Sequence, residues 1–469
     1  MKNHPTRASR ARLYLGLLGL SLWSACSQAE EGTAAIERPS FLLISLDTLR
    51  ADFLGAYGFE KDSSPAIDRL AAEGTVFTDV TSAAPWTLPS HASLLSGLYP
   101  SRHGVTDKMF RLDKPTLPKL FKAGGYRTMA INNALLVGHP NFNLMEGFDL
   151  DKYEPEQKPH LGAGSATLNS AKPIIDQAIS WLGEGDPEQP FFMFLHFYDA
   201  HTDFTPDAKW RAEFVGPYSG KLRGGTKQII QARTPGKELS PEDAEWLRQM
   251  YTAEIRTLDE ELARLFGYLD RSGLSEETIV VITSDHGEEY MEHGGVLHGR
   301  THYQELLHIP LVMRGPGIPR GLRVELPVHL VDVAPTLLKL GGQEPSGMDG
   351  VDLSLSWLAP HQLPSPRFLF AEADHNNVAG NNLHRMVRLD QYKLHYDTLT
   401  GRKQLYDLSL DPGEQIDLIE DNQALADLLW AELQRFMAGE TNGIGVDALS
   451  SEELEQLDAL GYGESNDEE

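Results

Sequence analysis

The sequence predicts an α/β protein: a mostly parallel central sheet flanked by helices, followed by a small C-terminal subdomain with an antiparallel sheet and a helix. Two observations carry this prediction. Between about residues 39 and 358, short apolar segments alternate with segments of helical periodicity, which is typical of a parallel sheet covered on both faces. Between about residues 359 and 463, short strand-like segments follow one another with only turns between them, which favours antiparallel pairing.

Apolar segments of strand length mark the central sheet. Those expected to be buried strands are Phe41–Leu46, Tyr126–Ile131, Pro190–Phe197 and Thr278–Thr283, and a further strand-like segment is His308–Met313. Helices are expected between the strands, where start signals and Gly stops bound segments of helical character. These helices are Ser64–Gly74, Thr116–Ala123, Asn169–Trp181, Pro241–Asp270 and Val331–Leu340.

Two further stretches complete the predicted organisation. Residues 205–240 are rich in Gly, Pro and basic groups, and they predict a long surface loop. The C-terminal subdomain is expected to contain four short strands, a closing helix and then a polar acidic tail. These elements are Phe368–Glu372, His384–Leu389, Tyr392–Tyr396, Lys403–Leu408, the helix Ala424–Met437 and the tail 464–469.

The N-terminus and the overall charge indicate the compartment. Residues 1–25 carry four Lys or Arg and no acidic residue, and the apolar run Leu13–Leu22 is too short to span a bilayer. Small residues before Cys26 resemble a bacterial lipobox, although Trp23 stands where Leu is usual. We expect residues 1–26 to be a lipoprotein signal peptide ending in an acylated Cys26, and residues 27–38 to be a tether. The predicted location is the bacterial cell envelope, membrane-anchored on the periplasmic or cell-surface side; secretion is the alternative.

Composition excludes other classes of function. The formal net charge of −27 argues against a nucleic-acid partner. Because Cys26 is the only cysteine, an intramolecular disulfide is impossible.

Thr87 precedes a segment with the features of a helix start. Pro89 suits the first helical turn, and Gly97 with Pro100 ends the helix. Thr87 would then lie at a helix N-terminus, where backbone N–H groups and the helix dipole favour an anion. A hydroxyl there is a candidate nucleophile for a phosphate or sulfate ester, and a simple N-cap is the alternative.

Other polar residues follow the ends of the predicted strands. Asp47 follows the first, Asp199 and His201 follow the third, and Asp285 and His286 follow the fourth. Parallel strands place their carboxyl ends at one edge, so these groups can converge. Carboxylates, an imidazole and a hydroxyl would bind one divalent ion, namely Ca, Mg or Mn, with Zn possible.

The chain resembles the sulfatase family of the alkaline phosphatase superfamily over nearly all of residues 40–462. The motifs that carry the resemblance are Leu46–Asp52, Pro65–Ala71, Leu88–Gly97, Asp199–His201, Thr283–Glu288, Val331–Leu337 and Leu405–Glu414. The resemblance implies an alkaline phosphatase-like α/β domain with a small C-terminal sheet. It also implies a metal ion held by Asp47, Asp285 and His286, with Thr87 as nucleophile and further ligand.

Departures from the family pattern bear on the chemistry. Sulfatases carry a Cys or Ser that is converted to formylglycine, but here the position is Thr87, so no formylglycine is expected. The Arg of that motif is replaced by His91, and the second Asp of the first-strand pair is Thr48. His298 stands where sulfatases often have a Lys.

These departures favour phosphorus over sulfur. Threonine nucleophiles in the superfamily belong to phosphodiesterases, phosphatases and phosphoglycerol or phosphoethanolamine transferases. We therefore predict a metal-dependent hydrolase of phosphate or sulfate esters, with phosphoester hydrolysis or transfer preferred. The alternatives are a sulfatase without Cys-derived formylglycine and a catalytically inactive ligand-binding lipoprotein.

The remaining histidines and one arginine are assigned around this centre. His201 and His298 are expected to contact the substrate anion or the leaving group, and His91, Arg102 and His103 to help bind the substrate. A second metal site formed by Asp199, His201 and His298 is an alternative. His196, inside a strand, is expected to be a packing residue.

Overall fold

The structure is a computed structural model, and it describes residues 38–153, 171–186, 188–234, 236–373, 384–439, 443–445 and 450–451. The predicted signal peptide, Cys26 and nearly all of the tether lie outside the described residues, as does the acidic tail. Among the described residues, no helix has both the length and the apolar character needed to cross a bilayer. The domain boundary near residue 358 stays a prediction.

The centre of the fold is an eight-stranded sheet in the order β12-β2-β11-β8-β1-β7-β5-β6. Its middle is parallel, because β1 pairs in parallel with both β7 and β8, and β5 pairs in parallel with β7 and β6. Every residue of β1, β7 and β8 is buried. These strands are β1 (Ser40–Leu46), β5 (Arg127–Asn132), β6 (Leu150–Tyr153), β7 (Phe191–Phe197) and β8 (Thr278–Ser284).

The other edge of the sheet departs from parallel order. Strand β11 (Leu311–Arg314) runs antiparallel to β8 and to β2 (Thr75–Phe77), and β12 (Leu322–Val324) pairs in parallel with β2. The strand expected at His308–Met313 therefore begins three residues later. The prediction of a mostly parallel sheet with flanking helices is confirmed.

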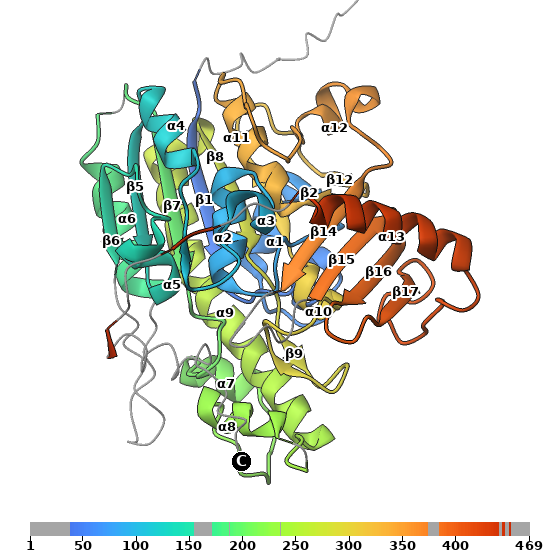
Figure 1. Ribbon diagram of the computed structural model, residues 1–469. Coiled ribbons are helices and arrows are strands. Elements are labelled where there is room, and N and C mark those ends of the chain that lie inside the picture. Colours follow the sequence, from blue (N-terminus) through green and yellow to red (C-terminus); the bar gives the residue numbers. More distant parts are fainter. Residues whose placement is uncertain are drawn as a thin grey trace, which may run out of the picture. The chain divides into compact units, whose positions relative to one another are not determined.

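Helices cover both faces because strand side chains alternate between them. From β1, Phe41 and Leu43 pack into one core cluster while Leu42 and Ile44 pack into the other. The first face is covered by α2 (Thr87–Ser96), α4 (Leu117–Ala123) and α11 (Val333–Leu340), and the second by α1 (Pro65–Ala72), α6 (Ala171–Gly183) and α9 (Pro241–Ser272) (Figure 1).

The start of α1 shows a tertiary contact replacing a predicted local one. Ser64 precedes the helix, but its side chain makes no capping hydrogen bond. Asp259 of α9 accepts hydrogen bonds from the backbone N–H groups of Ala66 and Ile67 instead. By contrast, α9 begins with a local capping box between Ser240 and Asp243.

The segment 205–240 is not a continuous loop, and this prediction was wrong in part. It contains α7 (Ala208–Phe214), α8 (Thr226–Ile230) and the 3-10 helix η4 (Gln231–Arg233). Its Gly and Pro residues suggested a loop, but α7 packs against the long helix α9, and this contact stabilises a short helix that the local sequence does not specify.

The C-terminal part forms the predicted antiparallel sheet, in the order β14-β15-β16-β17. Helix α13 (Gln423–Met437) packs across this sheet through Leu429 and Leu433, as Figure 1 shows. Arg388 of β15 forms an ion pair with Asp79, which joins this sheet to the larger domain. The strands are β14 (Phe368–Ala373), β15 (His384–Leu389), β16 (Tyr392–Asp397) and β17 (Lys403–Asp407).

Short elements connect these layers. The 3-10 helices are η1 (Ala51–Phe53), η2 (Gly55–Tyr57), η3 (Pro140–Phe142), η5 (Leu274–Glu276), η6 (Leu330–Asp332) and η7 (Pro360–Gln362). The short strands are β3 (Val80–Thr81), β4 (Phe110–Arg111), β9 (Glu289–Tyr290), β10 (Val296–Leu297), β13 (Val328–His329) and β18 (Ile444–Gly445). The short α-helices are α3 (Pro100–His103), α5 (Leu135–Gly138), α10 (Gln304–Leu307) and α12 (Leu355–Leu358).

Candidate active site

Three buried side chains meet beyond the carboxyl ends of β1 and β8. These strands pair in parallel with Leu46 opposite Ser284, so the next residues, Asp47 and Asp285, emerge side by side. Their carboxylates and the His286 imidazole offer ligand atoms that all lie within 4.8 Å of one another. His286 Nε2 lies 3.3 Å from Asp285 Oδ2 and 3.8 Å from Asp47 Oδ1. We call these three residues the Asp–Asp–His cluster.

Thr87 faces this cluster from the first position of α2. Its side chain is buried, and its Oγ1 lies 3.4 Å from His286 Nε2. The helix is held in place by Ser90, whose hydroxyl donates to the carbonyl oxygen of Asp285 at 2.7 Å. Gly97 ends the helix with a φ of +70°, as the sequence predicted. The structure thus brings together the four residues predicted to bind the metal.

Two buried histidines lie next to the cluster. His91 places Nε2 2.9 Å from Ser45 Oγ and Nδ1 3.5 Å from Asp285 Oδ2. His196 places Nε2 3.2 Å from Asp47 Oδ2. Burial lowers the pKa of His91 to about 3 and that of His196 to about 4, so both are neutral near pH 7. Each histidine thus contacts one carboxylate of the cluster, and His196 lies in the buried interior expected of a packing residue.

His298 lies beside His286, and His201 lies beside His298. The His298 ring centre is 4.5 Å from that of His286 and 4.9 Å from that of His201. His298 Nδ1 lies 3.1 Å from Glu288 Oε1, and His201 Nε2 lies 3.1 Å from the Tyr198 hydroxyl. His298 is therefore a neighbour of the cluster, and His201 is a neighbour of His298.

Glu288 was not singled out from the sequence. It is fully buried beside His298, and burial raises its pKa to about 8. Arg50 donates to the Glu288 backbone oxygen and pairs with Asp52 and Glu292. The sequence feature that could have pointed to Glu288 is its position two residues after His286.

Arg102 and His103 are placed elsewhere, so their predicted role in substrate binding has no support in the geometry. Arg102 lies 3.9 Å from Asp349 Oδ1 and lines a pocket with Phe436 and Gly439. His103 is buried, with Nε2 3.0 Å from Ser93 Oγ and Nδ1 accepting from the Val105 N–H. The short helix α3 turns both side chains toward α2 and the C-terminal part.

Asp199 lies near the strand end as expected, but it has a different task. Its Oδ1 accepts a hydrogen bond from the Ala171 N–H at the start of α6, at 2.9 Å. Within the described ranges, the only group of three potential ligands found is the Asp–Asp–His cluster. A second metal site involving Asp199 therefore gains no support.

The cluster fits a divalent cation. Two carboxylates this close repel each other unless a positive charge lies between them. In the described part of the chain, the buried oxygen Oδ2 of Asp285 accepts no hydrogen bond, and the buried hydroxyl of Thr48 has no partner. Thr48 has a φ of +55°, which is strained for a β-branched residue, and its N–H donates to Asp285 Oδ1. Such strain is typical of functional sites.

Comparisons with known proteins agree with this geometry. A sequence profile of the family described as Sulfatase matches residues 39–343, and one described as N-sulphoglucosamine sulphohydrolase, C-terminal, matches residues 292–439. The chain is similar to a sulfatase of Formosa agariphila, at 27% identity over 86% of this chain and 88% of the relative. It is similar to the multifunctional alkaline phosphatase superfamily protein PehA of Trinickia caryophylli, at 27% identity over 82% of this chain and 92% of the relative.

A solved structure shows the same fold. The phosphonate monoester hydrolase of Agrobacterium radiobacter superposes with a TM-score of 0.70, at 23% identity over 86% of this chain and 95% of that chain. The fold and the buried polar centre define an ester-hydrolysing enzyme of the alkaline phosphatase-like class. This chain belongs to the sulfatase family, because the family profile covers well over half of it.

Proposed function

We propose that the protein hydrolyses or transfers phosphoesters, with the hydroxyl of Thr87 as nucleophile. The observation that carries the proposal is the position of Thr87 Oγ1, at the N-terminus of α2 and 3.4 Å from His286 Nε2 of the cluster. An anionic ester placed there would lie at the positive end of the helix dipole. Relatives named as sulfatases and as a phosphonate monoester hydrolase support the class of anionic ester.

Asp47, Asp285, His286 and Thr87 would hold one divalent ion, of which Ca, Mg and Mn suit the oxygen ligands and Zn is possible. Bound there, the ion would lower the pKa of the Thr87 hydroxyl and offset negative charge on the ester. His91 and His196 would keep the two carboxylates oriented, as their contacts with Asp285 and Asp47 indicate.

The proposed reaction has two displacements. The Thr87 hydroxyl gives up its proton, its Oγ1 bonds to phosphorus, the bond from phosphorus to the leaving oxygen breaks, and the released alcohol takes up the proton. A water molecule or another alcohol then attacks phosphorus, which breaks the bond to Thr87 Oγ and returns the hydroxyl its proton. His201 and His298 are proposed to donate hydrogen bonds to the ester oxygens and to relay the proton lost by Thr87 to the leaving alcohol.

Threonine favours phosphorus for a chemical reason. An alkoxide can attack phosphorus directly, whereas the sulfatase route uses an aldehyde hydrate that a threonine side chain does not form. The second candidate function is sulfate-ester hydrolysis by this threonine, and it is favoured by the family profile itself.

The deciding experiment is a paired assay on metal-replete protein. Aryl phosphate monoesters and diesters are compared with an aryl sulfate under identical conditions, with Thr87→Ala as the background control. Turnover of a phosphate ester in preference to the sulfate, lost in the variant, supports the proposal. Preferential sulfate turnover that needs Thr87 would establish the second candidate. No turnover of any ester by protein that binds metal would favour an inactive binding protein.

Metal removal is expected to lower both activity and stability. A ligand that binds only the folded state at 100 times its Kd contributes about 2.7 kcal/mol to the free energy of unfolding. Chelation should therefore lower the Tm, and Mg, Ca, Mn or Zn should restore it. Asp285→Asn should bind metal much more weakly by calorimetry, while Asp176→Asn, an exposed carboxylate on α6, should behave as the wild type. An unchanged Tm after chelation and re-addition would contradict the metal assignment.

A further inference from the structure

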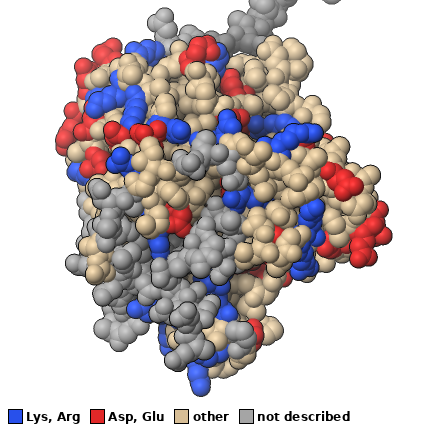
Figure 2. Space-filling view, viewed as in Figure 1, with Lys and Arg blue, Asp and Glu red and all other residues tan. Residues whose placement is uncertain are grey.

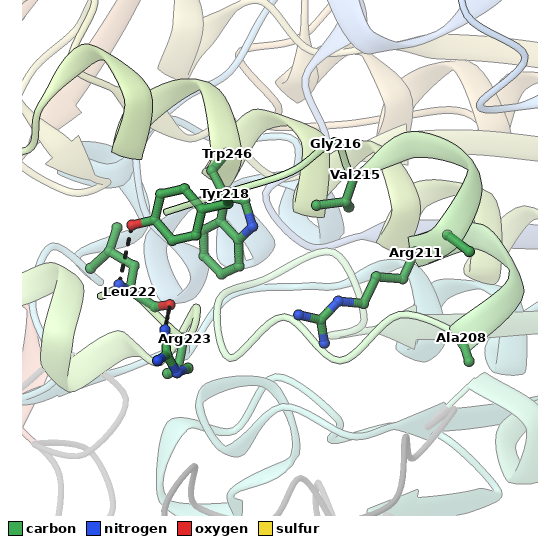
Figure 3. Close-up of a pocket in the computed structure, with 9 residues that line it drawn as sticks. Ala208, Arg211, Val215, Gly216, Tyr218, Leu222, Arg223 and Trp246 are labelled. Carbon is green, nitrogen blue, oxygen red and sulfur yellow. Dashed lines mark hydrogen bonds between the residues drawn. The ribbon is translucent and has the colours of Figure 1, made fainter. Parts of the chain in front are cut away.

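One arginine of the basic segment between β7 and α9 turns into the protein. Residues 208–237 contain seven Lys or Arg and one Glu. Figure 2 shows Lys and Arg side chains on the surface at the end of the molecule where Figure 1 places α7 and α8. Arg211 and Arg223, which line the surface pocket drawn in Figure 3, are exposed. Arg233 instead directs its guanidinium to the backbone beside the candidate active site.

Arg233 holds the backbone on both sides of Leu297. Its guanidinium donates to the carbonyl oxygens of His298 and Val296 at 3.1 and 3.2 Å. Burial lowers the pKa of Arg233 to about 10, so the group keeps its positive charge near pH 7. Hydrogen bonds from a charged donor are stronger than those from a neutral one. They therefore fix the path of the chain where β10 ends.

The chain on either side of His298 has an uncommon backbone conformation. Leu297 has a φ of +65° and Gly299 a φ of +94°. Glycine adopts such angles easily, whereas they cost free energy for leucine. Strained residues of this kind persist where surrounding contacts hold them, and they are concentrated at functional sites. The strain at Leu297 thus points to a requirement for the exact placement of His298.

Glu288 holds the ring of the same histidine. Glu288 Oε1 lies 3.1 Å from His298 Nδ1, and both side chains are buried. A hydrogen bond between these two atoms fixes the rotation of the imidazole, whichever of them carries the proton. Because this bond engages Nδ1, Nε2 is the ring nitrogen that serves an ester.

The surroundings of Glu288 favour this role over simple packing. In the described part of the chain, its second oxygen, Oε2, accepts no hydrogen bond. Of the two arginines nearby, Arg50 donates to the Glu288 backbone oxygen at 2.9 Å, and Arg233 donates to the backbone of His298. Burying a carboxyl group costs free energy, and an apolar side chain would fill the same space at a lower cost. The contact with His298 is what the carboxyl group adds.

His298 is close to the groups of the proposed reaction. Its ring centre lies 4.5 Å from that of His286, whose Nε2 lies 3.4 Å from Thr87 Oγ1. Two contacts therefore connect His298 to the proposed nucleophile. Glu288 follows His286 by two residues, so the same short stretch of chain supplies a cluster residue and the partner of His298.

We propose that Glu288 is a positioning residue of the active site, which holds the His298 imidazole so that its Nε2 meets the leaving oxygen of the ester. This role rests on the proposed function, in which His298 relays the proton lost by Thr87 to the leaving alcohol. Glu288 neither gains nor loses a proton in that step, so the proton balance of the reaction is unchanged. Without Glu288 the ring takes several orientations, and only some of them serve the leaving oxygen.

The test compares two phosphate esters that differ in their need for a proton. Para-nitrophenol leaves readily as an anion, whereas phenol leaves with more help from an acid. Both esters are assayed with metal-replete wild type and Glu288→Met, which replaces the carboxyl group by an unbranched apolar side chain. For the phenyl ester, kcat should fall by about 100-fold, within the usual contribution of acid catalysis. For the para-nitrophenyl ester, kcat should fall by less than about fivefold, and KM should change by less than about twofold for both.

Two further variants separate positioning from damage to the fold. Glu288→Gln keeps a hydrogen bond to His298 Nδ1, so it should restore most of the phenyl-ester turnover that Glu288→Met loses. Glu289→Met is the matched control, because Glu289 is the next residue, is also buried, and contacts Thr301 at 3.0 Å. It should change both esters by the same factor. A leaving-group-dependent loss in Glu289→Met, or equal losses in Glu288→Gln and Glu288→Met, would overturn the inference.

NMR of the histidine ring nitrogens gives a measurement that needs no turnover. Long-range proton–nitrogen spectra are recorded on the full chain, and the His298 signals are identified by their loss in His298→Ala. The wild type should show one tautomer of His298, and Glu288→Met should shift or split these signals. Exchange between two tautomers in the wild type would overturn the inference even if Glu288→Met does not fold.

The two measurements together separate this inference from the proposed function. A His298 ring that Glu288 fixes, in a protein that turns over no ester, would contradict the proposed function alone. Turnover that requires Thr87 but shows no leaving-group dependence in Glu288→Met would contradict the role of Glu288 alone.

Discussion

Replacing Thr87 with alanine is expected to lower kcat for the preferred ester by about 10⁴- to 10⁶-fold, the range seen when an enzyme loses its nucleophile. The residue lies at the first position of α2 with a buried side chain that faces the Asp–Asp–His cluster, and no other hydroxyl is predicted to attack. Alanine is compatible with a helical position, so the fold should persist. Steady-state kinetics and the Tm measure the two effects.

Two controls separate loss of the nucleophile from damage to α2. Thr87→Ser keeps a hydroxyl at the same position and should recover most of the lost rate. Ser93→Ala removes another buried hydroxyl from the same helix, one that contacts His103, and should lower stability with little effect on kcat. Acid-quenched wild-type protein should carry a phosphoryl group on the peptide containing Thr87, detected by mass analysis. Near-wild-type turnover by Thr87→Ala would refute the nucleophile.

Replacing Glu414 with glutamine is expected to lower the free energy of unfolding by about 3–5 kcal/mol, the usual cost of breaking a buried ion pair from one side. Glu414 Oε1 lies 2.9 Å from Lys393 Nζ and 2.9 Å from His395 Nε2, and the Lys393 and Glu414 side chains are wholly buried. Its other oxygen accepts from the Gln304 N–H at 2.6 Å. The variant would leave the Lys393 ammonium buried without its counter-charge. Urea unfolding at pH 7 measures the change.

The pH dependence of stability gives an independent test of the same group. Burial alone would raise the pKa of Glu414, but Lys393 and His395 lower it to about 2. A carboxylate with a lowered folded-state pKa stabilises the protein above its unfolded pKa of about 4.5, and this stabilisation is lost as the pH falls toward 2. The wild type should therefore lose more stability than Glu414→Gln between pH 5 and pH 2.5.

Glu420→Gln is the matched control, because Glu420 is an exposed acid of the same connection. It should match the wild type in urea at pH 7 and in its loss of stability below pH 5. If Glu414→Gln unfolds at the same urea concentration as this control, the pair contributes nothing measurable. The assignment of Glu414 as a link between the β16 strand and α10 would then be wrong.

Much of the fold followed from periodicity. The apolar segments at β1, β5, β7 and β8 are buried on both faces, which continuous hydrophobic runs specify well. The antiparallel strands after residue 360 were equally clear from their short spacing. The helices of segment 205–240 were not predicted, because its Gly and Pro residues suggested a loop. Packing against α9 stabilises α7 in that segment.

The part of the site that lies at the ends of parallel strands could be predicted from the sequence. The part that depends on how distant segments pack together could not. Asp47 and Asp285 could be placed together from the sequence because parallel strands end at one edge of a sheet. Thr87 could be placed at a helix N-terminus because Pro89 and Gly97 mark the start and the end of its helix. Arg102 and His103 follow the same motif as Thr87, yet α3, which begins after the turn at Gly97, places them beside Asp349 and Ser93.

The sequence by itself determined the buried strands β1, β5, β7 and β8, the helix start at Thr87 and the three residues that could hold a cation, since these depend on local hydrophobic period and on parallel strand ends. The strands β2, β6 and β12 and the helices α7 and α8 were not predicted. Only the tertiary structure decided which buried groups meet over long separations. His196 beside Asp47, Glu288 beside His298 and Glu414 between Lys393 and His395 are such cases. Side-chain pairing in a low-dielectric interior depends on packing of distant segments, which no local pattern encodes.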